Sequence, residues 1–335
     1  MKTIFEPVML GKLRLKNRLI RSATWEALAD EGGHMRQELF DTYERLAAGG
    51  VGAIITGFTS TADDDRYFGG MARLSRDELI PEHQRLTKLC HAHSCPVIVQ
   101  LALGEYNGTQ RNMPIDSMSA ADIAAVRDMF VDAAVRAGES GYDGVQIHAA
   151  HGFFLSRFIS PAYNRRRDKW GGSAENRARL VVEILRGIKE AAPALHVTMK
   201  INGADFIRGG LTPEDCAAVC ALCESHGLDS VEISGNGTSA AGIRAGVNEA
   251  YFRNLAAPIA ERLAIPVILV GGHRSPACME RLLNETKIEF LSLSRPLVRE
   301  PDLPARWQGG DLAPAQCVSC NSCYGTPGHR CIFAV

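Results

Sequence analysis

The chain has 335 residues, a formal net charge of -1 and 46% hydrophobic residues. A near-neutral charge argues against a nucleic-acid-binding surface, which is basic and clustered. No apolar run approaches the roughly 18 residues that a membrane-spanning helix needs, and residues 1–7 lack the apolar core of a secretory signal. We therefore expect a cytoplasmic protein that binds neither nucleic acid nor membrane.

Short apolar runs alternate with longer helical patterns along the chain. The expected strands cover residues 18–24, 52–57, 96–101, 144–148, 196–202, 230–234, 266–270 and 289–293. The expected helices cover residues 37–48, 77–93, 120–140, 174–191, 213–226, 248–263, 276–284 and 302–308. Several strands are apolar on both faces, as buried parallel strands are.

Eight strand–helix units without a break in composition predict the α/β class, as a TIM (β/α)8 barrel. An open doubly wound sheet is the alternative, but it favours a glycine-rich fingerprint after the first strand, which this chain lacks. We expect two parts, a barrel over residues 1–310 and a short Cys-rich C-terminal tail over residues 311–335.

Two histidines follow the fourth predicted strand, where the chemistry of a barrel is found. His148 ends the strand and His151 lies three residues on. Two imidazoles there can donate hydrogen bonds to one anionic or carbonyl oxygen and stabilise charge that grows in a transition state. A metal-binding pair and two structural histidines are the alternatives.

Three further strand ends carry groups that suit an anion. Lys200 ends the fifth strand, and its partner is either a bound anionic group or a carboxylate on a neighbouring strand. Gly271 and Gly272 end the seventh strand, and Ser294 and Arg295 end the eighth. Phosphate sites of barrels often form at these two strand ends, from loop amides and a bidentate arginine.

Seven of the ten cysteines fall into two sets. Four of them form a C-x2-C-x2-C-x7-C run near the C-terminus, comprising Cys317, Cys320, Cys323 and Cys331. Such a run can hold an iron–sulfur cluster, zinc takes four thiolates as well, and four unligated thiols are the third reading. The other set lies at helical spacing together with His226, and it comprises Cys216, Cys220 and Cys223. A metal site is the alternative, but we expect these thiols to pack on one helix face as small hydrophobes.

The sequence resembles the old yellow enzyme family, the FMN-dependent NADH:flavin oxidoreductases, over about residues 5–307. The resemblance rests on the segments 15–18 (LKNR), 99–101 (VQL), 141–152 (GYDGVQIHAAHG) and 160–177 (SPAYNRRRDKWGGSAENR). The cysteine run is similar to the branch that includes 2,4-dienoyl-CoA reductase and trimethylamine dehydrogenase, whose barrels carry a [4Fe-4S] cluster.

The resemblance implies an enzyme that binds FMN, takes NAD(P)H as reductant and passes hydride from flavin N5 to a carbonyl-activated alkene or a related small molecule. His148 and His151 would be its catalytic pair and bind the activating oxygen of the substrate. The residues implied in cofactor binding are Ser22, Ala23, Thr24, Gly57, Gln100, Lys200, Gly271, Gly272, Ser294 and Arg295.

Two positions depart from the family pattern. Phe153 stands where the family usually has the tyrosine that protonates the alkene, so Tyr106, another group or water would supply the proton. Trp25 stands where the family often has a Thr or Cys that contacts the flavin. Trp25, Phe153 and Tyr106 are accordingly expected to contact the substrate.

Other functions stay open on the sequence alone. A flavin-free barrel isomerase or aldolase would use the phosphate site and a Schiff base on Lys200. An FMN/iron–sulfur electron-transfer protein would receive electrons from a partner protein. A zinc-bound tail would serve as an interaction module. We also expect a homo-oligomer.

Overall fold

The computed structural model describes residues 1–65, 67–106 and 113–334. Its described part contains eight parallel strands that pair in a closed ring, because β3 pairs with both β11 and β4. Short β5 (Ala72–Arg73) adds to the outer end of β4. The ring strands are β3 (Leu19–Arg21), β4 (Ala53–Ser60), β6 (Val97–Ala102), β7 (Gly144–Ala149), β8 (His196–Asn202), β9 (Ser230–Ser234), β10 (Val267–Val270) and β11 (Phe290–Leu293).

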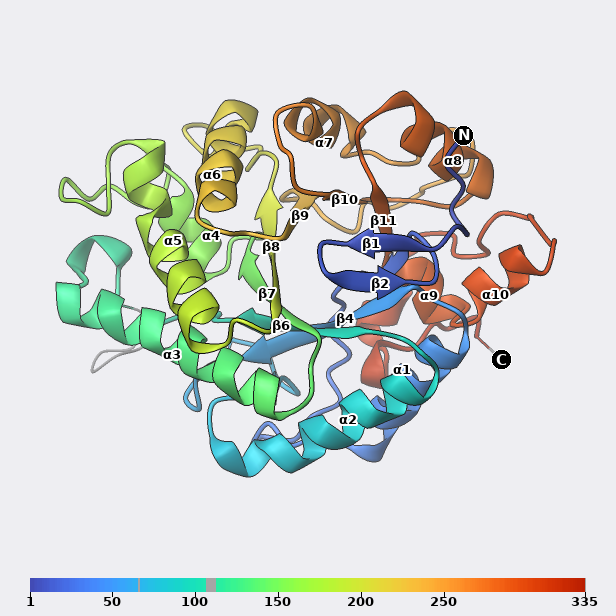
Figure 1. Cartoon of the computed structure of the whole chain (residues 1–335), viewed down its shortest axis with the longest axis horizontal. Helices are drawn as coiled ribbons and strands as arrows, with labels where there is room; N and C mark the ends of the chain where they lie inside the picture. The colour runs from blue at the N-terminus through green and yellow to red at the C-terminus, as the bar shows by residue number, and fades with distance from the viewer. Residues whose placement is uncertain (66, 107–112, 335) are drawn as a thin grey trace.

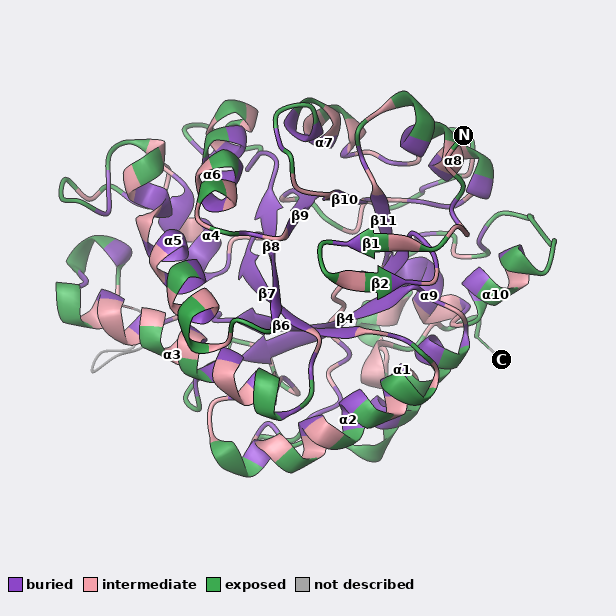
Figure 2. Ribbon diagram, in the orientation of Figure 1, coloured by how far each residue is buried: buried purple, intermediate pink, exposed green. Residues whose placement is uncertain are grey.

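Helices surround the ring of strands (Figure 1), and their inner faces are buried while their outer faces are exposed (Figure 2). They are α1 (Gln37–Ala48), α2 (Ile80–Ala92), α3 (Ala120–Glu139), α4 (Phe154–Ile159), α5 (Ala174–Ala191), α6 (Pro213–Ser225), α7 (Arg253–Ala260), α8 (Pro276–Glu285), α9 (Arg295–Arg299) and α10 (Leu303–Gln308). Single 3-10 turns lie at Asp77–Leu79, Ile115–Ser117, Ser322–Gly325 and Pro327–His329. None of the helices in the described ranges has the length and apolarity to cross a membrane.

The barrel prediction is confirmed. All eight predicted strands are present, and β8 and β9 have the predicted bounds. Helix α6 begins where expected, because the Thr212 hydroxyl accepts from the backbone N–H of Asp215 in a capping box. Helix α7 begins later than predicted, at Arg253, because Ala250 adopts a left-handed φ of 54° that no helix accommodates.

A hairpin that the sequence pattern did not indicate closes one end of the barrel. It pairs β1 (Val8–Leu10) with β2 (Leu13–Leu15). Its Leu10 and Leu15 are fully buried in one apolar cluster with barrel residues near the starts of β4, β6, β10 and β11. Burial of these leucines excludes water from the N-terminal ends of the strands. The hairpin therefore covers this end of the barrel with apolar side chains.

Helix α6 explains the second cysteine set. Cys216, Cys220 and Cys223 are fully buried and belong to the main hydrophobic core between the helices and the barrel. Burial raises the pKa of Cys223 above its ordinary value, which keeps the thiol protonated and apolar in character. These thiols fill the core, as their helical spacing predicts.

Buried neutral histidines predict a loss of stability in acid. Burial lowers the pKa of His83, His196 and His273 to about 4, whereas the unfolded chain restores a value of about 6.5. Between these values the unfolded state binds more protons, so the free energy of unfolding falls as pH is lowered, by about 1.4 kcal/mol per pH unit for each histidine. Urea unfolding at pH 7, 6 and 5 measures the slope.

The variant His83→Gln isolates the contribution of one histidine to the pH dependence of the free energy of unfolding. The His83 ring lies between the Tyr142 hydroxyl at 2.7 Å and the Arg73 carbonyl at 2.9 Å. Glutamine does not titrate, so the variant should be less stable at pH 7 but lose less stability on acidification than the wild type. Equal pH slopes for the two proteins would contradict the prediction.

Candidate active site

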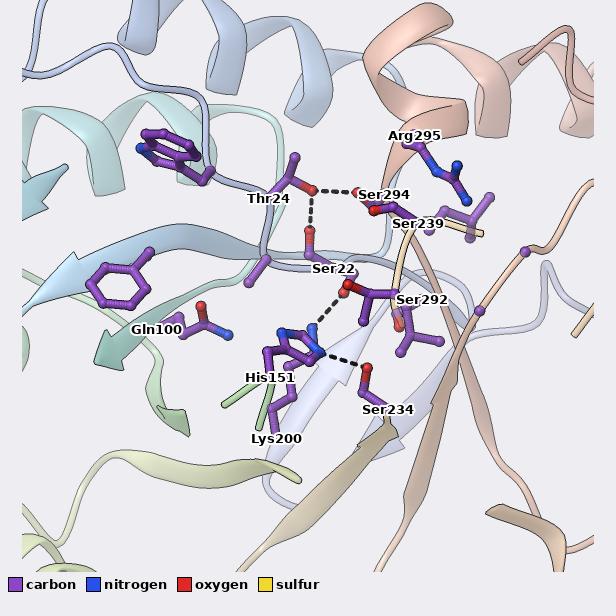
Figure 3. A pocket seen from close by; sticks show the side chains of 18 of the residues that line it. Ser22, Thr24, Gln100, His151, Lys200, Ser234, Ser239, Ser292, Ser294 and Arg295 are labelled. Atoms are coloured by element: carbon purple, nitrogen blue, oxygen red, sulfur yellow. Dashed lines mark hydrogen bonds between the residues drawn. The ribbon is translucent and has the colours of Figure 1, made fainter. Parts of the chain in front are cut away.

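A cavity of about 380 Å³ opens at the C-terminal ends of the strands (Figure 3). Most of the residues singled out from the sequence line this one cavity, although they come from both ends of the chain. They are Ser22, Ala23, Thr24, Trp25, Gln100, His148, His151, Phe153, Lys200, Gly271, Gly272, Ser294 and Arg295.

Two predicted residues do not line the cavity. Tyr106 donates its hydroxyl to Asp122 Oδ1 at 3.2 Å and packs on Phe154. At Gly57 a Cβ would lie 2.5 Å from the Thr24 carbonyl oxygen. The missing side chain of Gly57 therefore makes room for the segment after β3.

A buried ion pair lies beneath the cavity. Lys200 Nζ on β8 is 3.1 Å from Glu232 Oε2 on β9, and the two residues are in register. Burial alone would raise the pKa of Glu232, but Lys200 and hydrogen bonds from Ser292, Ser22 and Gln146 lower it below its ordinary value. The carboxylate is thus charged. Of the two partners that the sequence left open for Lys200, the structure shows the carboxylate on a neighbouring strand.

A chain of amides extends from the ion pair to the cavity wall. Gln146 Nε2 donates to Glu232 Oε2 at 2.9 Å, and Gln100 Nε2 donates to Gln146 Oε1 at 2.8 Å. These two bonds fix the Gln100 amide with its Nε2 toward Gln146. Its carbonyl oxygen has no hydrogen-bond donor among the described residues. Gln100 therefore has a hydrogen-bond acceptor, its side-chain carbonyl oxygen, that stays unpaired within the described residues at the cavity wall.

The two histidines lie together and are neutral. Their ring centres are 5.2 Å apart. Burial first, and then the Lys200 charge, lower the pKa of His151 to about 3, and burial, His151 and Lys200 hold the pKa of His148 well below its ordinary range. His151 hydrogen-bonds the Ser234 hydroxyl at 2.8 Å (Figure 3). The backbone N–H of Ala150 donates to His148 Nδ1 at 3.4 Å, which places the His148 proton on Nε2 as a donor.

The opposite end of the cavity is cationic. Arg274 and Arg295 line it, and no carboxylate does among the described residues. Gly271 and Gly272 have φ of 126° and 82°, and the backbone N–H groups of Gly272 and His273 donate to no atom of the described chain. Free amides beside guanidinium groups suit a phosphate.

Four aromatic side chains, which we call the aromatic wall, cover the side of the cavity next to the histidines. The sequence pattern indicated only Phe153; the others show no periodicity or motif. Trp25 stacks on this wall, with its ring centre 4.3 Å from that of Phe68. The wall comprises Phe58, Tyr67, Phe68 and Phe153.

The Cys-rich tail returns to the barrel mouth. Tyr324 lines the main cavity, and His329 Nδ1 lies 2.7 Å from the Trp25 carbonyl. Arg295 Nη1 donates to Asn321 Oδ1 at 2.5 Å, between two of the cysteines. A second, smaller cavity bordered by Arg295 and Arg299 is lined by all four thiols, those of Cys317, Cys320, Cys323 and Cys331.

The tail thiols lie apart from one another in the described structure. Within residues 1–65, 67–106 and 113–334, no three Cys, His or carboxylate side chains are close enough to share one ion. A tetrahedral zinc site needs its sulfurs about 2.3 Å from one point.

Comparison with known proteins agrees with this geometry. A family model described as the NADH:flavin oxidoreductase / NADH oxidase family matches residues 3–311. The chain is 30% identical over 358 residues to an NADH oxidase from Thermoanaerobacter brockii, covering 96% of this chain and 53% of that protein.

Two solved structures show the same fold. A 2-naphthoyl-CoA reductase in complex with 2-naphthoyl-CoA superposes with a TM-score of 0.87 at 23% identity, over 95% of this chain and 54% of that one. Histamine dehydrogenase from Rhizobium sp. 4-9 superposes with a TM-score of 0.82 at 26% identity, over 93% of this chain and 48% of that one.

The fold and cavity define a (β/α)8 barrel with a ligand site at the C-terminal ends of its strands. The chain belongs to the NADH:flavin oxidoreductase / NADH oxidase family. The resemblance found in the sequence is thereby confirmed. The chain spans about half the length of the first curated relatives it matches, between 50% and 53%.

The ion pair predicts strong coupling in a double-mutant cycle. Lys200→Met or Glu232→Gln alone leaves one buried charge without its partner, which costs about 3–5 kcal/mol. The double variant removes both charges and should lose much less stability than the sum of the two single losses. Urea unfolding at pH 7 gives the coupling.

An exposed pair on the same protein serves as the control. Lys287 and Glu261 are 3.1 Å apart, with side chains 63% and 56% exposed. Solvent screens such a pair, so Lys287→Met and Glu261→Gln should be additive. Additive losses at Lys200 and Glu232 would show that the buried pair is not coupled.

Proposed function

We propose that this chain binds FMN and reduces a carbonyl-activated alkene or a related small molecule with electrons from NADH or NADPH. The observation that carries the proposal is one cavity that holds a phosphate-type end, a fixed amide and cation, and a pair of neutral imidazole donors. FMN, when bound, supplies hydride to the substrate, and the protein orients and polarises the reactants.

The residues present fit FMN. Gly271, Gly272 and Arg295 would hold the phosphate, because free amides and a guanidinium group meet there. The carbonyl of Gln100 and the ammonium of Lys200 would contact the flavin ring, which has both N–H donors and carbonyl acceptors on its edge. Ser22, Ala23 and Thr24 would line the same ring.

The histidine pair would bind the activating oxygen of the substrate. A neutral imidazole with its proton on Nε2 donates a hydrogen bond without carrying a charge into the cavity. Two such donors polarise a carbonyl and stabilise the negative charge that develops on its oxygen. Substrates with a neutral carbonyl therefore suit this end better than cations do.

The same geometry argues against a Schiff-base aldolase. A nucleophilic lysine needs its amine unprotonated, as in an apolar pocket or beside another cation. Lys200 instead forms an ion pair with a fully buried carboxylate at 3.1 Å, and no second cation lies beside it among the residues of this pair.

Removal of both histidines tests the oxygen site. His148→Ala with His151→Ala should retain bound FMN and its absorption spectrum but weaken the binding of a phenol, whose oxygen stands in for the substrate's. Two lost hydrogen bonds at about 0.5–1.5 kcal/mol each correspond to a roughly 5- to 150-fold higher Kd. Titration of the flavin absorption with phenol measures it.

A histidine outside the cavity provides the matched control. His34 lies on the surface with its side chain 48% exposed, and His34→Ala should bind phenol as the wild type does. An unchanged phenol Kd in the double variant would refute the oxygen-site role. If the purified protein takes up no added FMN, the proposal that it binds FMN is wrong.

We further propose that the tail holds a [4Fe-4S] cluster. Four thiols around one cavity beside Arg295 and Arg299 support it, because the two guanidinium groups would balance the negative charge of a thiolate-bound cluster. An electron-donor protein could then deliver electrons through the cluster, as an alternative to NADH or NADPH.

Iron and sulfide analysis of anaerobically purified protein tests the cluster. Cys320→Ala and Cys331→Ala should each lower the iron and sulfide content well below that of the wild type, while the FMN content stays the same. Cys278→Ala, on α8 and outside the tail, is the control and should keep both. Zinc without iron or sulfide in the wild type would replace the cluster with a zinc site.

A further inference from the structure

Reduction of a carbon–carbon double bond needs an acid as well as a hydride, and the cavity holds few candidates. No Asp, Glu or Cys lines it among the described residues. His148 and His151 are neutral, and Lys200 is paired with Glu232. The acidic groups left on the cavity wall are the phenols of Tyr67, Tyr251 and Tyr324.

Two of the three phenols are engaged elsewhere. The Tyr324 hydroxyl hydrogen-bonds the Ser239 hydroxyl. The Tyr251 ring covers the glycine pair at the phosphate end, where a Cβ on Gly272 would lie 2.8 Å from it. The Tyr67 hydroxyl makes no hydrogen bond to any described residue.

Tyr67 lies on the same side of the cavity as the histidines. Its ring centre is 5.1 Å from that of Phe153, and the Phe153 ring centre is 4.8 Å from that of His148. In an enone the carbon that accepts the proton is bonded to the carbonyl carbon. An oxygen held by the histidines therefore brings that carbon toward the aromatic wall.

A buried carboxylate fixes the backbone of Tyr67. Asp65 Oδ1 accepts from the Tyr67 N–H at 3.1 Å, and Asp65 Oδ2 accepts from the Gly104 N–H at 2.9 Å and from the Ser60 hydroxyl at 2.9 Å. Gly104 makes room for the tyrosine, because a Cβ there would lie 2.2 Å from Tyr67 Cβ. Asp65 thus attaches the backbone beside Tyr67 to the end of β4 and to the segment after β6.

We propose that Tyr67 is the catalytic acid of this site, an assignment that rests on the proposed function. Hydride originating from NADH adds to the β carbon, and the π electron pair moves toward the oxygen held by His148 and His151. As the carbonyl re-forms, the α carbon takes the Tyr67 proton. Water then reprotonates the phenolate, because Tyr67 is 41% exposed. The balance is one NADH and one proton consumed, and NAD⁺ and a saturated carbonyl compound formed.

Tyr67→Phe tests the assignment. Enzyme with bound FMN is reduced with NADH and mixed in a stopped-flow instrument with 2-cyclohexenone or with ferricyanide. Ferricyanide takes electrons without protonation of a carbon. The variant should reoxidise with ferricyanide at the wild-type rate and with the enone about 100-fold more slowly, the size expected for loss of a general acid.

Two further variants sharpen the result. Tyr163→Phe removes a phenol that is 45% exposed and lies outside the cavity, and it should leave both rates unchanged. Phe153→Tyr in the Tyr67→Phe background places a phenol on the adjacent ring and should restore the enone rate at least tenfold. Because proton transfer to carbon would then limit the enone reaction, the solvent deuterium isotope effect should be larger in Tyr67→Phe than in the wild type and should return toward the wild-type value with the rescue.

The outcomes separate the two proposals. A wild type that reduces the enone and a Tyr67→Phe variant that does so equally fast would overturn the assignment of Tyr67 alone. A wild type that reduces ferricyanide but no enone would overturn both the assignment and the proposed function. Selective loss with ferricyanide unchanged, together with rescue, supports both.

Discussion

The buried pair of Lys200 and Glu232 is the constraint on which the site depends. Taking two charges out of water costs several kcal/mol per ion, and the pair persists only where geometry and hydrogen bonds compensate. Glu232 on β9 meets this condition by accepting from Ser22 after β3, Gln146 on β7 and Ser292 on β11. One carboxylate on β9 thereby connects residues of β7, β8 and β11 and the segment after β3 at the floor of the cavity.

That pair also sets the polarity of what lies above it. Because Glu232 offsets the charge of Lys200, the histidine end of the cavity carries little net charge. Its imidazoles stay neutral chiefly because burial lowers their pKa values. Net positive charge is concentrated at the other end, at Arg274 and Arg295. The cavity is therefore graded, from a cationic end at the two arginines to neutral imidazoles and an aromatic wall.

The sequence predicted the barrel because its strands and helices alternate with distinct periods, and it predicted the strand-end residues because a barrel orders them in space. It did not identify Glu232, although a salt bridge for Lys200 was considered, because strand register is not visible in one sequence. It also placed Tyr106 in the site and not Tyr67. Loop residues reach a cavity through contacts such as that of Tyr67 with Gly104, which have no periodic signal.

Hydrogen bonds cross the boundary that the sequence predicted at residue 310, between the barrel and the Cys-rich tail. Arg295, from the phosphate end, donates to Asn321 between Cys320 and Cys323, and Arg274 donates to Ser319 at 2.5 Å. Tyr324 completes the cavity wall. Arg274 and Arg295 thus contact both the cavity and the cysteine run, so the hydrogen bonds of this segment tie it to the barrel mouth.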